Sequence, residues 1–78
     1  MSDARPVATL WRLALNDDRL FCNVYRQPGG YELRLESPST VILAERFDLQ
    51  PRMLARTERL RASLTRRGWR EEQLPPTN

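Results

Sequence analysis

The stretch "LFCNVYRQPGGYELRLES", residues 20–37, decides the fold because its pattern predicts two strands joined by a tight turn. In both halves apolar residues recur at every second position, which is the period of a half-buried strand. Pro28 suits the second position of a type II turn, and Gly29 or Gly30 supplies the positive φ that this turn requires. A parallel crossover needs roughly a dozen residues or more, so a connection this short predicts antiparallel strands.

Two similar runs flank this hairpin, "TLWRLAL" at residues 9–15 and "TVILAERF" at residues 40–47. Turn-forming residues separate them from it, the tripeptide at residues 16–18 on one side and "SPS" at residues 37–39 on the other. Four runs with such short connections predict an antiparallel meander. Alternation along the runs places these residues on the face that forms the core: Trp11, Leu13, Leu15, Leu20, Cys22, Val24, Tyr31, Leu33, Leu35, Val41, Leu43 and Phe47.

A helical pattern follows the fourth run. Its core stripe at helical spacing consists of Met53, Thr57, Leu60 and Leu64. Asp48 is placed to cap the helix by accepting a backbone N–H, and Pro51 is tolerated in the first turn, where its missing N–H has no intrahelical partner. We therefore expect a helix from about Leu49 to Arg67. The fold class predicted is α+β, a four-stranded antiparallel meander packed on one C-terminal helix, in the order ββββα.

The end of this helix also has a sequence signature. Gly68 suits the left-handed position that follows a helix, and Trp69 after it is expected to pack on Leu64, as in a Schellman motif. We expect one small sheet-plus-helix domain over residues 8–70, with flexible tails at residues 1–7 and 71–78.

The helix is rich in arginine. Residues 52–71 contain seven arginines and no lysine, and residues 51–78 have a net charge of +4 against −1 for residues 1–50. Helical geometry gathers five of the arginines on or beside one side, here called the arginine flank: Arg52, Arg56, Arg59 and Arg66, with Arg67 at its border. Like charges at this spacing weaken a helix by a few tenths of a kcal/mol per pair. The flank is therefore either a solvated face or a binding surface for an anionic partner.

The outer face of the sheet is the second candidate surface. Its charged residues nearly balance, and cross-strand pairs of arginine and glutamate account for them structurally. Phe21, Tyr25 and Ile42 are predicted on the same face. Apolar and aromatic groups on a bare sheet face indicate a partner or a dimer.

Reaction chemistry is not expected. The chain has no histidine, so its serines have no imidazole base, and its single cysteine, Cys22, sits at a core position. No phosphate-binding glycine loop and no set of metal ligands occurs, so neither a cofactor nor a metal is expected. The longest apolar run, "VILA", is far shorter than the roughly 20 residues of a membrane span. We expect a cytoplasmic, non-catalytic protein without a membrane partner.

A sheet that leads into one helix through "AERFDLQPRMLARTERL" resembles the arm-binding domains of phage integrases, over roughly residues 20–67. That resemblance implies DNA binding by the sheet. Here, however, the sheet face includes Glu32 and Glu36, and the positive charge lies on the helix.

These features predict a small binding module, such as a regulator, adaptor or antagonist, that docks on a protein partner or associates with itself. Its expected contacts are the arginine flank, or Phe21, Tyr25 and Ile42 on the sheet. The alternative is a nucleic-acid-binding protein that uses the arginine flank.

Overall fold

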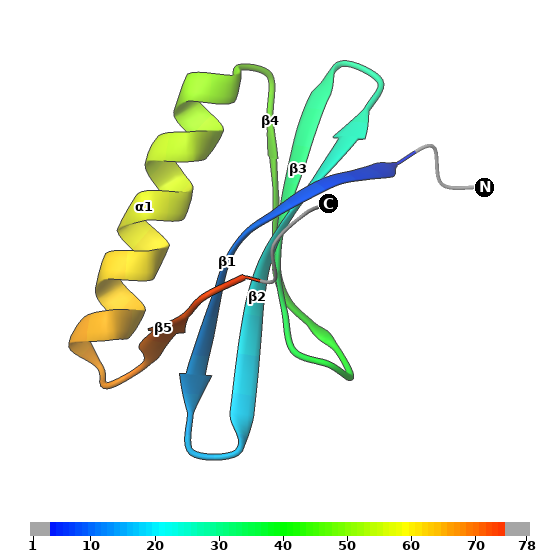
Figure 1. Cartoon of the computed structure of the whole chain (residues 1–78). Coiled ribbons are helices and arrows are strands. Elements are labelled where there is room, and N and C mark those ends of the chain that lie inside the picture. Colours follow the sequence, from blue (N-terminus) through cyan, green and yellow to red (C-terminus); the bar gives the residue numbers. More distant parts are fainter. Residues whose placement is uncertain (1–3, 75–78) are drawn as a thin grey trace.

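The computed structural model describes residues 4–74 and confirms an α+β fold in which the helix follows the four strands of the meander (Figure 1). The elements are β1 (Arg5–Leu15), β2 (Asp18–Gln27), β3 (Gly30–Glu36), β4 (Val41–Phe47), α1 (Gln50–Arg66) and β5 (Arg70–Glu72). The described strands form one sheet in the order β4-β3-β2-β1-β5, and every neighbouring pair is antiparallel.

The turn between β2 and β3 has the predicted chemistry. Gln27 pairs with Gly30 across a two-residue connection, and Gly29 has a φ of 84°, the value that the third position of a type II turn requires. Gly30 also has a positive φ, of 152°, and its backbone lies against the carbonyl of Phe47. The hairpin is thus fixed both by its turn and by a close approach of β4.

α1 covers one face of the sheet (Figure 1), and the core lies between the two. Its buried hydrophobic residues are Trp11, Leu13, Leu20, Cys22, Val24, Leu33, Leu35 and Met53. Thr57, one turn after Met53, is also buried and donates its hydroxyl to the backbone carbonyl of Leu54. Leu60 and Leu64 pack against the same cluster, so the predicted apolar stripe of the helix is confirmed.

One inward assignment was wrong, at the start of β4. The register shifts there, so that Glu36 pairs with Val41 while Leu35 pairs with Leu43. The residue between them, Ile42, is the extra residue of a β-bulge, which breaks simple alternation along the strand. Val41 therefore lies on the side of Glu36 and is 48% exposed instead of facing the helix.

The predicted cap at the start of α1 was also wrong. The N-cap residue is Leu49, which makes no side-chain cap hydrogen bond, and its carbonyl accepts from the backbone N–H of Met53 at 3.3 Å. The helix begins one residue later than expected, so the Asp48 carboxylate lies one position too early to cap it. Pro51 does occupy the first turn.

The predicted end of α1 is confirmed. The backbone N–H of Trp69 donates to the carbonyl of Leu64 at 3.1 Å, and that of Gly68 donates to Thr65 at 3.1 Å. Gly68 has a φ of 103°. These are the two hydrogen bonds of a Schellman motif, and Trp69 packs against the core beside Leu64.

The strands extend beyond the predicted domain limits of residues 8–70. β1 begins at Arg5, and β5 pairs with β1 through Ala14↔Arg70, Leu13↔Glu71 and Arg12↔Glu72. Residues 71 and 72, which we expected in a flexible tail, thus complete the sheet. The outermost parts of both predicted tails, residues 1–3 and 75–78, lie outside the described residues.

Candidate functional site

The arginine flank lies on the side of α1 that faces β4. Arg56 marks this side, because its Nε donates to Oε1 of Glu45 in β4 at 2.9 Å and its Nη2 donates to Oε2 at 3.2 Å. Arg52 and Arg59 lie within about 60° of Arg56 around the helix axis. Both are exposed, as are Arg66 and Arg67. Four members of the flank therefore present their guanidinium groups to solvent.

Arginines without a carboxylate partner are more frequent on the flank than elsewhere on the described surface. Each of the six glutamates contacts a basic or polar side chain within the protein. Seven arginines have no carboxylate partner among residues 4–74: Arg5, Arg26, Arg52, Arg59, Arg66, Arg67 and Arg70. Four of these belong to the arginine flank, so unneutralised positive charge is concentrated there.

On the outer face of the sheet, by contrast, several polar side chains bond to one another. Tyr25 donates its hydroxyl to Oε1 of Glu36 at 2.7 Å, and Asn23 donates its amide to the same oxygen at 3.3 Å. The guanidinium of Arg34 lies 4.1 Å from the centre of the Tyr25 ring and pairs with Glu32. Tyr25 is thus held within a side-chain network, which gives it a structural role on this face.

The three aromatic and apolar residues predicted for this face are not gathered into one exposed patch. Phe21 is half-buried and lies opposite Arg12 and Glu36 on the neighbouring strands. Ile42, displaced by the bulge, lines a hollow of about 430 Å³ with Leu20 at the end of the sheet. Ile42 is 55% exposed, whereas Phe21 and Tyr25 are half-buried.

The hydrogen bond between Tyr25 and Glu36 predicts a measurable pH dependence. The Glu36 carboxylate raises the pKa of the Tyr25 hydroxyl above its ordinary value of 10.0, and burial acts in the same direction. The folded state therefore retains this proton more tightly than the unfolded state. This stabilisation is fully present below pH 10.0 and is lost as the pH rises through the folded pKa. In a Tyr31→Phe background, ultraviolet titration should show that Tyr25 ionises at a higher pH than free tyrosine.

Glu36→Gln provides the control for that titration. It keeps the shape of the side chain but removes the charge, so the ionisation of Tyr25 should move toward its ordinary pH. An identical titration curve for the two proteins would contradict the assignment of the shift to Glu36.

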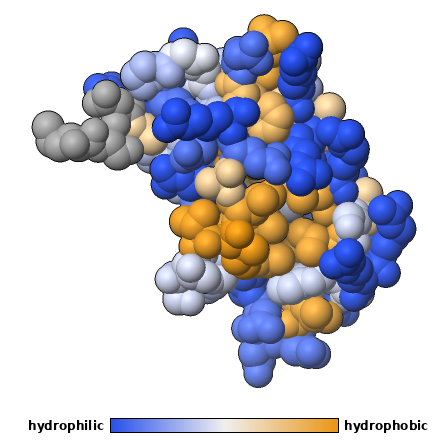
Figure 2. Space-filling model, turned by 180° about the vertical axis from the view of Figure 1, so that it is seen from behind, coloured by the Kyte–Doolittle hydropathy of each residue, from blue (hydrophilic) through white to orange (hydrophobic). Residues whose placement is uncertain are grey.

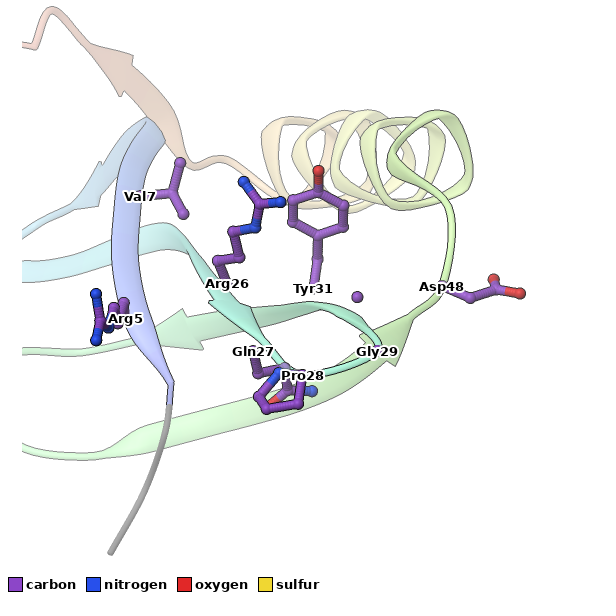
Figure 3. A pocket seen from close by; sticks show the side chains of 9 residues that line it. Arg5, Val7, Arg26, Gln27, Pro28, Gly29, Tyr31 and Asp48 are labelled. Atoms are coloured by element: carbon purple, nitrogen blue, oxygen red, sulfur yellow. The ribbon is translucent and has the colours of Figure 1, made fainter.

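A second candidate site is a hollow of about 890 Å³ at the turn between β2 and β3 (Figure 3). The lining residues are Arg5, Val7, Arg26, Gln27, Pro28, Gly29, Gly30, Tyr31 and Asp48. Arg5 and Arg26 are directly opposite each other on β1 and β2, and Figure 3 shows the side chains of Arg26 and Tyr31 rising side by side. Like charges in opposite positions destabilise a sheet, and Asp48 adds a negative charge to the lining of the same hollow.

Sequence reasoning missed this hollow for two reasons. Arg5 was assigned to a flexible tail, and its pairing with Arg26 depends on two bulges in β1 that no periodic pattern predicts. The available signal was the inward position of Arg26, which follows Leu20, Cys22 and Val24 at every second residue of β2.

Within residues 4–74, no cluster of three or more potential metal-ligating side chains of histidine, cysteine, aspartate or glutamate is present. Nor does this part of the chain contain a helix that is long and apolar enough to span a membrane.

Comparisons with protein-family models, with curated proteins and with solved structures give no significant match.

Proposed function

We propose that this chain is a non-catalytic binding module that docks on an acidic surface of a protein partner through the arginine flank. The observation that supports the proposal is the uneven pairing of charge. All six glutamates are engaged within the protein, while Arg52, Arg59, Arg66 and Arg67 have no carboxylate partner among the described residues. Carboxylates of a partner would form ion pairs with these four guanidinium groups.

The chemistry of arginine fits this role. A guanidinium group donates two parallel hydrogen bonds to one carboxylate, so a few arginines in a row give both affinity and orientation. The contact between Arg56 and Glu45 is a bidentate ion pair of this kind within the protein. Binding of an acidic partner would also relieve the repulsion between like charges along the flank.

The non-catalytic part of the proposal has independent support. The chain lacks histidine, and Cys22 is a free, buried thiol whose pKa burial raises to about 12. A thiol with so high a pKa is a poor nucleophile. A single unpaired cysteine also suits the reducing cytoplasm, where we place the protein.

A nucleic acid is the second candidate partner, because the same four unpaired arginines would neutralise phosphates. About four phosphate contacts predict a slope of roughly −3 to −4 when the logarithm of the binding constant is plotted against that of the salt concentration. Such binding would not depend on base sequence, since no aromatic side chain is interleaved with the arginines as a stacking platform.

The two candidates are separated by measuring binding to polyglutamate and to duplex DNA at about 0.15 M salt. We expect the wild type to bind polyglutamate and Arg52→Glu with Arg59→Glu to weaken that binding by about tenfold or more. Both residues are exposed and unpaired within the described part of the chain, so the fold should survive.

The matched control is Arg5→Glu with Arg26→Glu, which changes the net charge equally but alters the hollow at the β2–β3 turn. It should bind polyglutamate within about twofold of the wild type. Equal losses in both double variants would contradict a specific role for the flank. Tighter binding to duplex DNA, lost only in the flank variant, would favour the nucleic-acid alternative.

A further inference from the structure

The outer edge of β4 is an unpartnered sheet edge. β4 is the terminal strand of the sheet, and within residues 4–74 its one strand neighbour is β3. It contributes exposed apolar side chains, with Val41 48% and Ile42 55% exposed. Figure 2, the view from behind Figure 1, shows apolar surface gathered at the centre of this side of the molecule with hydrophilic residues around it.

The register of the sheet indicates which backbone groups β4 leaves free. Gln27↔Gly30 closes a two-residue hairpin, and the closing pair of such a hairpin is hydrogen-bonded. Bonded and non-bonded pairs alternate along antiparallel strands, so β3 directs the backbone groups of Leu33 toward its partner Glu45 in β4. Ala44, the residue before Glu45 in β4, then points its N–H and C=O away from β3, toward the free edge.

The middle of the arginine flank lies beside β4. The pair between Arg56 and Glu45 shows that a flank arginine reaches the helix-facing side of β4, with an N···O distance of 2.9 Å. Arg52 and Arg59, about one turn away on either side, have the same length and no carboxylate partner among the described residues. A strand added beyond β4 would place its helix-facing side chains beneath these two groups.

We propose that the edge of β4 accepts an extended segment of a protein partner as an additional antiparallel or parallel strand, with acidic residues alternating with apolar ones. Side chains of a strand alternate between faces, so the acidic residues would meet Arg52 and Arg59 while the apolar residues extend the opposite face beside Val41. This inference rests on the proposed function and specifies how the partner binds and which sequence it needs.

A second copy of this chain fits the edge poorly. Antiparallel pairing of β4 with another β4 makes one continuous sheet, which puts both helices on the same face. The two arginine flanks would then oppose each other across the seam, with Arg52 and Arg59 of each copy unneutralised. Juxtaposed like charges across an interface oppose association. Charge complementarity therefore selects an acidic segment as the occupant.

The test uses a peptide of seven residues, the length of β4, in which glutamate and valine alternate. Its binding is compared with that of a peptide in which lysine replaces glutamate. Ala44→Pro removes the edge-facing N–H, and proline is tolerated on an edge strand where that group faces solvent. Ala44→Ser keeps the N–H and is the matched control. Thermal unfolding of each variant shows that the fold is kept.

We expect the wild type and Ala44→Ser to bind the glutamate peptide, and binding should slow hydrogen exchange at the backbone amide of position 44 in both proteins. Ala44→Pro, and separately Arg52→Glu with Arg59→Glu, should each weaken binding by about tenfold or more. The lysine peptide should not bind.

Other outcomes overturn the proposal. Ala44→Pro could bind the glutamate peptide as tightly as the wild type while Arg52→Glu with Arg59→Glu loses binding. That result would contradict strand addition at β4 but would still support docking on the arginine flank. Absence of wild-type binding, or equal binding of the lysine peptide, would remove the acidic strand as the occupant. Sedimentation of the wild type as a dimer that Ala44→Pro dissociates would assign the edge to a second copy.

Discussion

Gly30→Ala should destabilise the protein by about 3–5 kcal/mol, most of what a domain of this size has to lose. A Cβ at Gly30 would lie 2.2 Å from the backbone carbonyl oxygen of Phe47, and φ is 152° there. The contact is with backbone, so no side-chain rotation relieves it. Either β4 moves away from β3 or the hairpin opens.

Gly29→Ala is the matched control, one residue earlier in the same turn. Gly29 also has a positive φ, of 84°, but a Cβ there would have no atom within 4 Å. The expected cost is only the conformational strain, about 1–2 kcal/mol. Urea unfolding followed by circular dichroism measures both variants. Equal stability of the two would show that β4 does not constrain Gly30.

Cys22 should react with a thiol reagent at least about a thousandfold more slowly in the folded protein than in the unfolded chain at pH 8. Its side chain is 0% exposed, and burial, followed by the negative charge of Glu58, raises its pKa from 9.0 to about 12. Thiolate is the reactive form, so its population falls by about three orders of magnitude before access is considered. Spectrophotometric labelling with and without urea measures the ratio.

A cysteine at an exposed position provides the comparison for this measurement. Cys22→Ser with Ser39→Cys moves the single thiol to the exposed turn before β4, where labelling should proceed at nearly the same rate with and without urea. Rapid labelling of native wild type would contradict the burial of Cys22. It would also weaken the argument that the cysteine has no chemical role.

The parts of the fold that follow from the sequence are those with strong local rules. The turn at Pro28 is determined by the φ that proline and glycine adopt, and the end of α1 by the glycine at position 68. The stripe on α1 follows from helical periodicity, so the location of the arginine flank on one side of the helix was predictable from residue numbers alone.

The features that sequence reasoning missed depend on contacts between distant segments. β5 has three residues, too few for a periodic pattern. Its two glutamates become structural only through distant partners: Glu72 pairs with Arg12 and Arg19 of the sheet, and Glu71 pairs with Arg61 of α1. The bulge at Ile42 likewise depends on how β4 is placed against β3. The bulge moves Val41 to the other face without any local signal.

The same limit applies to the candidate sites. The sequence indicated an excess of arginine on the helix. Which of these arginines lack a carboxylate partner depends on the side chains that surround them in the folded protein. Arg56 belongs to the predicted flank and is nevertheless paired with Glu45. Tyr25, which we expected at a binding face, also donates its hydroxyl to Glu36, a contact that the sequence does not indicate.

The pairing of β5 with β1 also bears on the order in which the sheet assembles. Arg12 donates to the backbone carbonyl of Gln73, 61 positions further along the chain, whereas β2, β3 and β4 each pair with the strand next to them in sequence. Contacts between distant residues carry the largest entropic cost of loop closure and form slowly. The meander and helix are therefore expected to come together first, and one border of the sheet remains open during folding until β5 arrives.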